Sequence, residues 1–183
     1  MHQIKLVIFD LDGTLIDAYA AVYRSLNHVM RQIHRPRVGH AMVKRSVGWG
    51  DRNLLGRFVG SAELGQALAI YRRHHDATLE SGVRFLPGAK QAIRQLKSKG
   101  YILSVASNRT TRSAEIILKY LKVRGYFDCV VCGDQLKRFK PHPQILKHIL
   151  KKTSLTPGEA IYIGDMAIDV ETGHRAKIKT IAV

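Results

Sequence analysis

The chain has 183 residues, of which 45% are hydrophobic and 24% are charged, so it can bury one sizeable core with room for a small second module. Its two cysteines are too few for a disulfide framework, and no apolar run is long enough to cross a bilayer. Lys and Arg number 30 against 14 Asp and Glu, which gives a formal net charge of +16. Acidic residues interrupt the apolar stretch near the amino terminus, so we expect no secretory signal and a cytoplasmic protein without a membrane partner.

The excess of basic residues attracts anions but does not by itself indicate a nucleic-acid interface. These residues are scattered through helix-like segments, and aromatic residues are not interleaved with them as a single-strand-binding surface requires. We therefore expect a solvated cationic surface and a small anionic partner. A basic protein that binds nucleic acid is the non-enzymatic alternative.

Residues 4–9 form a short apolar run of β-forming residues, the pattern of a strand buried on both faces of a parallel sheet. Asp10 and Asp12 come at its end, and Gly13-Thr14 permits a sharp exit. Open α/β sheets bind their ligands at the carboxyl ends of central strands. Burial of two carboxylates there is costly unless a cation or a reaction uses them, so this stretch is the predicted centre of the site.

Residues 18–82 are predicted to be wholly helical, beginning with a long amphipathic helix. A second helix covers about residues 40–47. The break Gly48-Trp49-Gly50 precedes two further helices, for which Asp51 and Ser61 are the candidate N-caps. This segment interrupts the sheet after its first strand, and we expect it to cover the site as a lid.

The second half of the chain alternates strand and helix patterns. Further strands are expected at residues 101–106, 127–132, 160–163 and 178–183. Helices are expected at residues 87–99, from Thr110 or Thr111 to about 121, at 144–151 and through Asp169. The alternation predicts an α/β fold with a parallel sheet and helices on both faces, built from residues 1–17 and 83–183.

Cys129 and Cys132 lie three positions apart in one predicted strand. Side chains with this spacing point to opposite faces of a strand, so the two thiols do not form half of a metal site. No second pair of ligands is available to complete a zinc site. We therefore expect two packed thiols.

Polar residues also follow the later strands. Ser107 and Asn108 follow the second strand, Lys140 lies in the loop after the third, and Asp165 and Asp169 follow the fourth. Because the carboxyl ends of parallel strands share one edge, these side chains should meet the two acids that follow the first strand. Hard oxygen ligands of this kind favour Mg²⁺, and a lysine and a hydroxyl group suit a bound phosphoryl group.

At these positions the chain resembles the haloacid dehalogenase superfamily of phosphohydrolases. The four motifs of the family occur in order, as Asp10-Leu11-Asp12-Gly13-Thr14, Ser107, Lys140-Pro141, and Gly164-Asp165 with Asp169. Three further stretches, at residues 85–88, 126–128 and 140–143, are similar to the phosphoglycolate phosphatase-like branch. The resemblance implies a Rossmann-like core over residues 1–17 and 83–183 and an inserted all-helical cap domain over residues 18–82.

The resemblance also implies a two-step mechanism. Asp10 attacks phosphorus and becomes an aspartyl phosphate, while Asp12 protonates the leaving oxygen and later deprotonates the hydrolytic water. The Asp10 carboxylate, the Asp12 backbone carbonyl and Asp165 hold Mg²⁺, and Asp169 supports the site from close by. The acid at position 12 weighs against the dehalogenases that named the superfamily, because they lack an acid there. Asp169 also suits the first turn of a helix, which is its alternative role.

The remaining implied roles concern the substrate. Ser107 hydrogen-bonds a phosphate oxygen and Lys140 neutralises the phosphate and the nucleophile, although Ser107 also suits a helix cap and Lys140 a solvated loop lysine. The further substrate contacts are expected from Gly13, Thr14, Asn108, Arg109 and Trp49. Arg109 replaces a lysine that is common in this branch, and its fork suits a carboxylate. Trp49 suits core packing equally well.

The sequence thus predicts a magnesium-dependent phosphatase of a small phosphate ester, with phosphoglycolate as the leading substrate. A sugar-phosphate mutase similar to beta-phosphoglucomutase and a pyrophosphatase of the same superfamily are the enzymatic alternatives. The sequence ends in the fifth strand, where relatives continue into another helix. We expect a homodimer to cover the open face of that strand.

Overall fold

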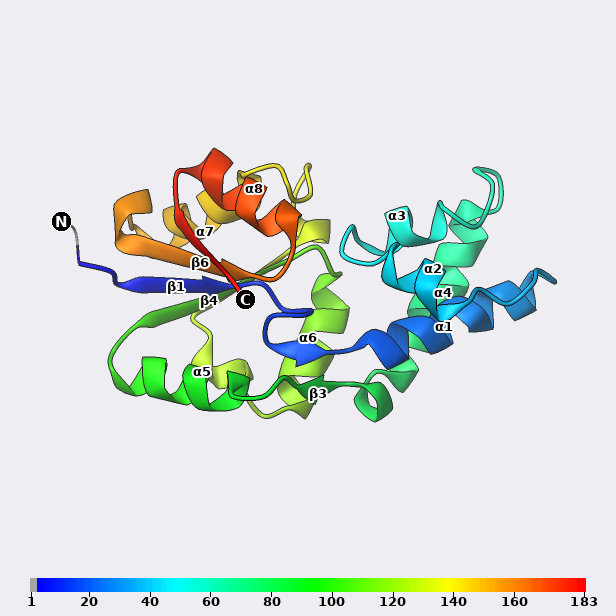
Figure 1. Ribbon diagram of the computed structural model, residues 1–183, viewed down its shortest axis with the longest axis horizontal. Helices are drawn as coiled ribbons and strands as arrows, with labels where there is room; N and C mark the ends of the chain where they lie inside the picture. Colours follow the sequence, from blue (N-terminus) through cyan, green and yellow to red (C-terminus); the bar gives the residue numbers. More distant parts are fainter. Residues whose placement is uncertain (1–2) are drawn as a thin grey trace.

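A five-stranded sheet in the order β5-β4-β1-β6-β7 forms the centre of the computed structural model, which describes residues 3–183 (Figure 1). Every neighbouring pair in this sheet is parallel. The strands are β1 (Leu6–Phe9), β4 (Ile102–Ser107), β5 (Cys129–Cys132), β6 (Ala160–Gly164) and β7 (Lys179–Ala182). The predicted α/β fold with a parallel sheet is confirmed.

The central position of β1 follows from its sequence, because all four residues of Leu6–Phe9 are buried and therefore need cover on both faces. It pairs with β4 on one side and with β6 on the other. The chain leaves β1 toward β4 and leaves β6 toward β7, so the direction of the connections reverses between β1 and β6. Ligand sites of open α/β sheets lie at the carboxyl end of such a switch point.

Two pairs of helices cover the two faces of the sheet (Figure 1). Val7 and Phe9 share one buried cluster with α5 (Ala89–Ser98) and α6 (Thr111–Tyr120). Leu6 and Ile8 share a second cluster with α7 (Gln144–Thr153) and α8 (Ala167–Ala176). Because successive side chains point to opposite faces of a strand, β1 contributes residues to the buried clusters on both faces of the sheet.

The two cysteines follow the same alternation. Cys129 belongs to the cluster under α7, and Cys132 belongs to the cluster under α6. Both are buried free thiols. The prediction of packed thiols on opposite faces is confirmed.

Four helices between residues 18 and 82 build a third buried cluster beyond the carboxyl edge of the sheet (Figure 1). They are α1 (Tyr19–Gln32), α2 (His40–Lys44), α3 (Asp51–Leu55) and α4 (Leu64–Thr78). The predicted N-caps are wrong. Asp51 is the first residue of α3, and its carboxylate binds Arg72 at 2.6 Å instead of capping the helix. Ser61 lies in a turn in which Gly60 accepts hydrogen bonds from the backbone of Glu63 and Leu64, so Glu63 takes the cap position of α4.

The chain enters and leaves this helical segment through a two-stranded antiparallel ribbon that the sequence did not predict. Ile16 of β2 (Ile16–Asp17) pairs with Phe85 of β3 (Arg84–Phe85), and Asp17 pairs with Arg84. Strands of two residues are too short to show a periodic pattern. Short 3-10 helices complete the fold at η1 (Glu80–Gly82), η2 (Arg124–Tyr126), η3 (Gly133–Gln135) and η4 (Pro157–Glu159).

No helix in residues 3–183 combines the length and the apolar character that a bilayer span requires. Strand β7 forms one edge of the sheet, and three of its four residues are exposed. The homodimer that was expected to cover this strand stays a prediction.

Candidate active site

A buried lysine stands at the centre of the carboxyl edge of the sheet. Lys140 is only 4% exposed, and its Nζ donates to Oδ1 of Asp10 at 2.6 Å and to Oδ1 of Asp169 at 2.7 Å. It also donates to the hydroxyl of Tyr162 at 3.0 Å and to the carbonyl of Ala106 at 3.2 Å. The alternative of a solvated loop lysine is therefore wrong. The first, third and fourth predicted motifs meet at this cation.

Asn108 holds the backbone of Lys140 in this position. Its Oδ1 accepts a hydrogen bond from the Lys140 N–H at 2.9 Å, and its Nδ2 donates to the carbonyl of Gly48 at 3.2 Å. Asn108 is 7% exposed. The residue predicted to contact substrate therefore connects the lysine loop to the helical segment, although it also lines the cavity described below.

Burial dominates the electrostatics of the carboxylates. Desolvation raises the pKa of Asp10 to about 7, although Lys140 acts in the opposite direction, and Asp169 raises this pKa further. Burial also raises the pKa of Asp165, and the charge of Asp169 adds to this effect. In contrast, Asp10 and its neighbours raise the pKa of Lys140 well above the usual value despite its burial. One lysine thus faces several acids, and a further cation would be favourable here.

The three acids form a group that suits a hard divalent ion. Asp10, Asp165 and Asp169 each offer a carboxylate oxygen, and these oxygens lie within 4.8 Å of one another. Oxygen donors at this spacing fit Mg²⁺. Gly13 permits the arrangement, because its φ is +82° and a Cβ atom there would lie 2.2 Å from Oδ2 of Asp165. Thr14 donates to Oδ1 of Asp165 at 3.3 Å.

Asp169 contacts the buried lysine and also caps the first turn of a helix. Its Oδ1 accepts hydrogen bonds from Lys140 and, at 2.6 Å, from the hydroxyl of Tyr162. Its Oδ2 accepts from the backbone N–H of Met166 at 3.1 Å, which caps the first turn of α8. Because both oxygens already have partners, Asp165 is the acid of the pair with more freedom to bind a metal ion.

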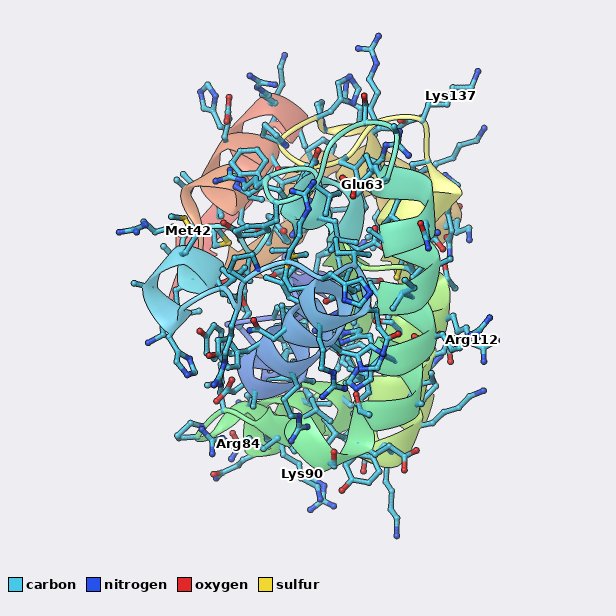
Figure 2. The ribbon with its side chains drawn as sticks, turned by 90° about the vertical axis from the view of Figure 1, so that its right-hand side faces the viewer. Met42, Glu63, Arg84, Lys90, Arg112 and Lys137 are labelled. Carbon is cyan, nitrogen blue, oxygen red and sulfur yellow. The ribbon has the colours of Figure 1, made fainter. Side chains whose placement is uncertain are left out.

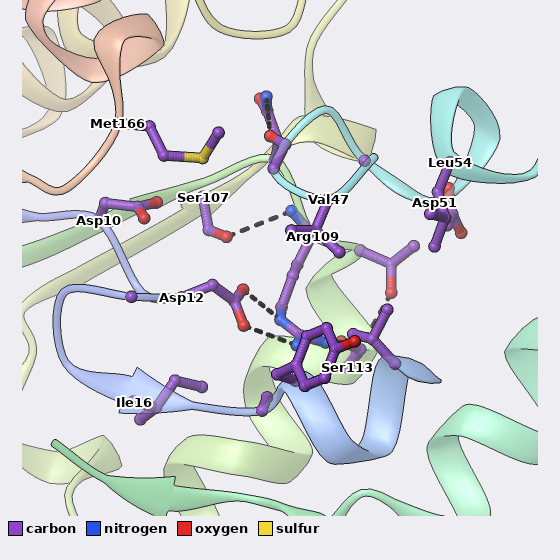
Figure 3. Close-up of a pocket in the computed structure, with 18 of the residues that line it drawn as sticks. Asp10, Asp12, Ile16, Val47, Asp51, Leu54, Ser107, Arg109, Ser113 and Met166 are labelled. Carbon is purple, nitrogen blue, oxygen red and sulfur yellow. Dashed lines mark hydrogen bonds and ion pairs between the residues drawn. The ribbon is translucent and has the colours of Figure 1, made fainter. Parts of the chain in front are cut away.

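Asp12 forms a two-pronged ion pair with Arg109, which Figure 3 shows at the cavity wall. The carboxylate accepts hydrogen bonds from Nε of Arg109 at 2.5 Å and from Nη2 at 2.7 Å. Nη1 of the same arginine donates to Nε2 of His75 at 2.8 Å and to Oγ of Ser113 at 3.0 Å. Arg109, predicted to meet the substrate, thus lies in the cavity wall with its donors directed at protein groups.

Ser107 ends β4 and faces the cavity, where its Oγ accepts a hydrogen bond from the Arg109 N–H at 3.2 Å (Figure 3). The cap of α6 is Thr110, whose side chain accepts from the Ser113 N–H. The alternative of Ser107 as a helix cap is therefore wrong. Its hydroxyl hydrogen remains available for an acceptor in the cavity.

A cavity of about 300 Å³ lies between the sheet edge and the helical segment. Its sheet side carries Asp10, Asp12 and Ser107, and its other walls include Met166, Val47 and Leu54 (Figure 3). Within residues 3–183, the lining also contains Gly13, Gly48, Gly50, Asp51, Asn108, Arg109, Lys140, Asp165 and Asp169.

Two predicted substrate contacts, Thr14 and Trp49, are not part of this lining as the described residues form it. The glycines on either side of Trp49 line the cavity instead. Both have positive φ values, +95° for Gly48 and +84° for Gly50. A Cβ atom on Gly48 would lie 2.4 Å from the sulfur of Met166, so this glycine permits close contact between the helical segment and the sheet edge. The Gly-Trp-Gly stretch thus contributes its two glycines to the lining, and the substrate contact of Trp49 stays a prediction.

Sequence reasoning missed His75 and Ser113, which bind Arg109. His75 lies in α4 and is 4% exposed, and its ring stacks on Tyr71 with a centroid distance of 4.9 Å. Burial, together with the positive charge of Arg109, lowers the pKa of His75 to about 3. One histidine in an amphipathic helix gives no local signal of such a contact.

Acidification should therefore destabilise the protein through His75. The folded state holds this ring neutral down to a pKa of about 3, whereas the unfolded state takes up a proton near 6.5. The contribution of His75 is fully present above pH 6.5 and is lost as the pH falls toward 3, by at most about 1.4 kcal/mol per pH unit. Urea unfolding at pH 7.5, 6 and 5 measures this loss.

The variant His75→Gln should lose less stability than the parent between pH 7.5 and pH 5, because it has no ring to protonate. His174→Gln is the matched control, since His174 is exposed on α8. Its replacement should leave the dependence of the unfolding free energy on pH the same as in the parent. Equal profiles for the parent and His75→Gln would contradict the assignment of a neutral buried ring.

The family model for haloacid dehalogenase-like hydrolases matches residues 7–183, and the chain belongs to this family. It is 31% identical over 179 residues to a phosphoglycolate phosphatase of Aquifex aeolicus, covering 96% of this chain and 83% of that protein. It is 27% identical over 186 residues to a phosphoglycolate phosphatase of Haemophilus influenzae, covering 95% of this chain and 83% of the relative. The family predicted from the four motifs is confirmed.

Solved structures agree with the fold. A crystal structure described as a predicted phosphoglycolate phosphatase from Haemophilus somnus superposes with a TM-score of 0.93 at 26% identity, covering 100% of this chain and 86% of that one. The structure of CbbY from Rhodobacter sphaeroides in complex with phosphate superposes with a TM-score of 0.89 at 20% identity, covering 98% of this chain and 86% of that one. The second likeness concerns the fold alone.

Proposed function

We propose that this chain is a magnesium-dependent phosphatase that hydrolyses a small phosphate monoester, with phosphoglycolate as the first substrate to test. The observation that carries the proposal is the buried contact of Lys140 with Asp10 and Asp169 at the carboxyl edge of the sheet, open to a cavity. A carboxylate beside a fixed cation suits attack on an anionic phosphoryl group. The names of the relatives support the substrate class.

In the proposed reaction, an oxygen of Asp10 forms a bond to phosphorus while the bond from phosphorus to the leaving oxygen breaks. Asp12 gives its proton to that oxygen and then takes a proton from the water that hydrolyses the aspartyl phosphate. Lys140 offsets charge on Asp10 and the phosphoryl group, and Ser107 donates its hydroxyl hydrogen to a phosphoryl oxygen. The splitting of one displacement into two lowers the barrier of each.

Magnesium would be held by the carboxylates of Asp10 and Asp165 and by the backbone carbonyl of Asp12. When bound, the ion supplies positive charge that favours ionised Asp10 and offsets the charge of the phosphoryl group. We assign Asp169 a supporting role, because its oxygens bind Lys140, Tyr162 and the first turn of α8.

We also propose that residues 1–17 and 83–183 act as the catalytic core and residues 18–82 as a cap. The separate buried cluster of the helical segment supports this division. The β2–β3 ribbon supports it as well, since both connections of the segment run through that pair of strands.

Phosphate release from a panel of phosphorylated metabolites tests the function. The panel includes phosphoglycolate, sugar phosphates and pyrophosphate, each with and without Mg²⁺. Free phosphate from monoesters supports the phosphatase, whereas an isomerised sugar phosphate without phosphate release would identify a mutase. Release from pyrophosphate alone would favour a pyrophosphatase.

Removal of the metal should abolish phosphate release, and added Mg²⁺ should restore it. Asp165→Asn should raise the Mg²⁺ concentration at half-maximal rate by at least about 10-fold, because it replaces a charged ligand with a neutral one. Glu171→Gln is the control, since Glu171 is exposed on α8 and binds Arg175. Full activity in the presence of a chelator would contradict the metal assignment.

A further inference from the structure

The guanidinium of Arg109 has a protein partner on every nitrogen. Nε and Nη2 donate to Asp12, and Nη1 donates to His75 and Ser113. The arginine side chain is 11% exposed, whereas that of Asp12 is 37% exposed. Both side chains line the cavity, and the arginine is the more buried of the two. Its fork binds both oxygens and fixes the plane of the Asp12 carboxylate, and each oxygen keeps a second lone pair for a group in the cavity.

The donor character of arginine sets the direction of a longer chain of hydrogen bonds. Because Arg109 can only donate, Nε2 of His75 must accept, and the hydrogen of this neutral ring lies on Nδ1. Nδ1 then donates to Oγ of Ser25 at 3.2 Å, and the Ser25 hydroxyl donates to Nδ1 of His74 at 3.1 Å. Ser25 is fully buried in α1. The lowered pKa of His75 agrees with this neutral state.

This series of hydrogen bonds connects the sheet edge with the helical segment. Asp12 and Arg109 follow β1 and β4, whereas His75, His74 and Ser25 belong to α4 and α1. If α4 moved away from the sheet edge, Nη1 of Arg109 would lose its hydrogen bond to His75 and keep only the one to Ser113. The orientation of the guanidinium would then be less fixed. A displacement of about 1 Å in a catalytic group can cost about 100-fold in rate.

We propose that Arg109 is a positioning residue for Asp12, and that its bond to His75 makes the orientation of Asp12 depend on the docking of α4. The inference rests on the proposed phosphatase function and deepens it. According to this inference, the contact between α4 and the sheet edge controls proton transfer by Asp12. It does not control phosphate binding.

Two phosphate esters separate this role from a structural one. An alkyl phosphate has a poor leaving group and needs the proton of Asp12, whereas p-nitrophenyl phosphate has a leaving group that departs without it. The measured quantity is the rate of the first step in single-turnover reactions. Arg109→Lys keeps the charge and removes the fork, and it should lower this rate about 10-fold to 100-fold more for the alkyl ester than for the aryl ester.

A double-mutant comparison then tests whether Arg109 acts through Asp12. Asp12→Asn should show the same preference for the aryl ester, and adding Arg109→Lys to it should change the rates less than 3-fold. Additive losses, or equal losses on both esters, would overturn the inference. An inactive parent enzyme on both esters would instead remove the proposed function, and the inference with it.

Variants of α4 test the second half of the proposal. His75→Phe keeps a ring that can stack on Tyr71 but removes the acceptor, so it should show the substrate dependence of Arg109→Lys. His75→Gln keeps an acceptor and should restore most of the alkyl-ester rate. Arg112→Ala breaks the 2.8 Å ion pair of Arg112 with Asp76, a second contact between α6 and α4, and should leave the ratio of the two rates unchanged.

Identical behaviour of His75→Phe and Arg112→Ala would overturn the role of His75. Thermal unfolding of each variant accompanies the kinetics. If Arg109→Lys fails to fold, the comparison of the two His75 variants decides the proposal, because both leave the ion pair of Arg109 with Asp12 in place.

Discussion

Replacing Asp10 with Asn should lower phosphate release by about 10⁴-fold, because an amide cannot act as the nucleophile. The fold should survive. Burial raises the pKa of Asp10 from 3.8 to about 7, so its ionisation destabilises the folded state increasingly as the pH rises through this range. The neutral amide avoids that penalty, and Asp169 remains as a partner for Lys140. Initial rates and thermal midpoints at pH 7.5 measure the two effects.

The thermal midpoint of Asp10→Asn should equal or exceed that of the parent. Asp134→Asn is the control, because Asp134 is exposed just after β5 and binds Thr111 instead of the central lysine. Its rate should stay near that of the parent. Substantial phosphate release by Asp10→Asn would show that another group attacks phosphorus.

Replacing Lys140 with Met should destabilise the protein by about 3–5 kcal/mol and abolish activity. The substitution leaves Asp10 and Asp169, at 6% and 1% exposure, without their cation. The deficit should be largest above pH 7, where Asp10 ionises, and should shrink at pH 5, where the neutral acid needs no partner. Urea unfolding at both pH values measures the deficit.

Lys137→Met is the matched control for this experiment. Lys137 lies in the same loop between β5 and α7 but is exposed, and Figure 2 shows its side chain extending away from the molecule. Its replacement should change stability by less than about 0.5 kcal/mol. A similar loss in both variants would mean that the loop, and not the buried charge, accounts for the effect.

Site residues that directly follow a strand or belong to a local motif could be predicted from the sequence. Asp10 could be predicted because it directly follows the apolar run that ends at Phe9, and this run has the pattern of a buried strand. Lys140 and Asp165 were located by local motifs after further strands, and the parallel order of the strands brought them to one edge. The metal-binding and substrate roles of these residues stay predictions for the experiments above.

The contacts of Arg109 show what local patterns cannot predict. Asp12 is 97 positions away in sequence and His75 is 34 positions away, and neither separation carries a periodic signal. The sequence predicted that Arg109 binds a carboxylate of the substrate, whereas in the structure its fork binds the carboxylate of Asp12. The pairing of β1 with β4 brings Asp12 and Arg109 together, and the packing of α4 beside the sheet edge adds His75.

The paired strands β2 and β3 have a consequence for how the chain tolerates change. Entry and exit of the helical segment lie one interstrand spacing apart, about 5 Å, and Asp17 and Arg84 fix that spacing with an ion pair of 2.7 Å. Insertions, deletions or wholesale exchange between these two residues therefore leave the register of the five-stranded sheet unaltered. Changes within this segment would therefore leave Asp10 and Asp165 in place at the edge of the sheet, whereas the proposed orientation of Asp12 also requires His75 of α4.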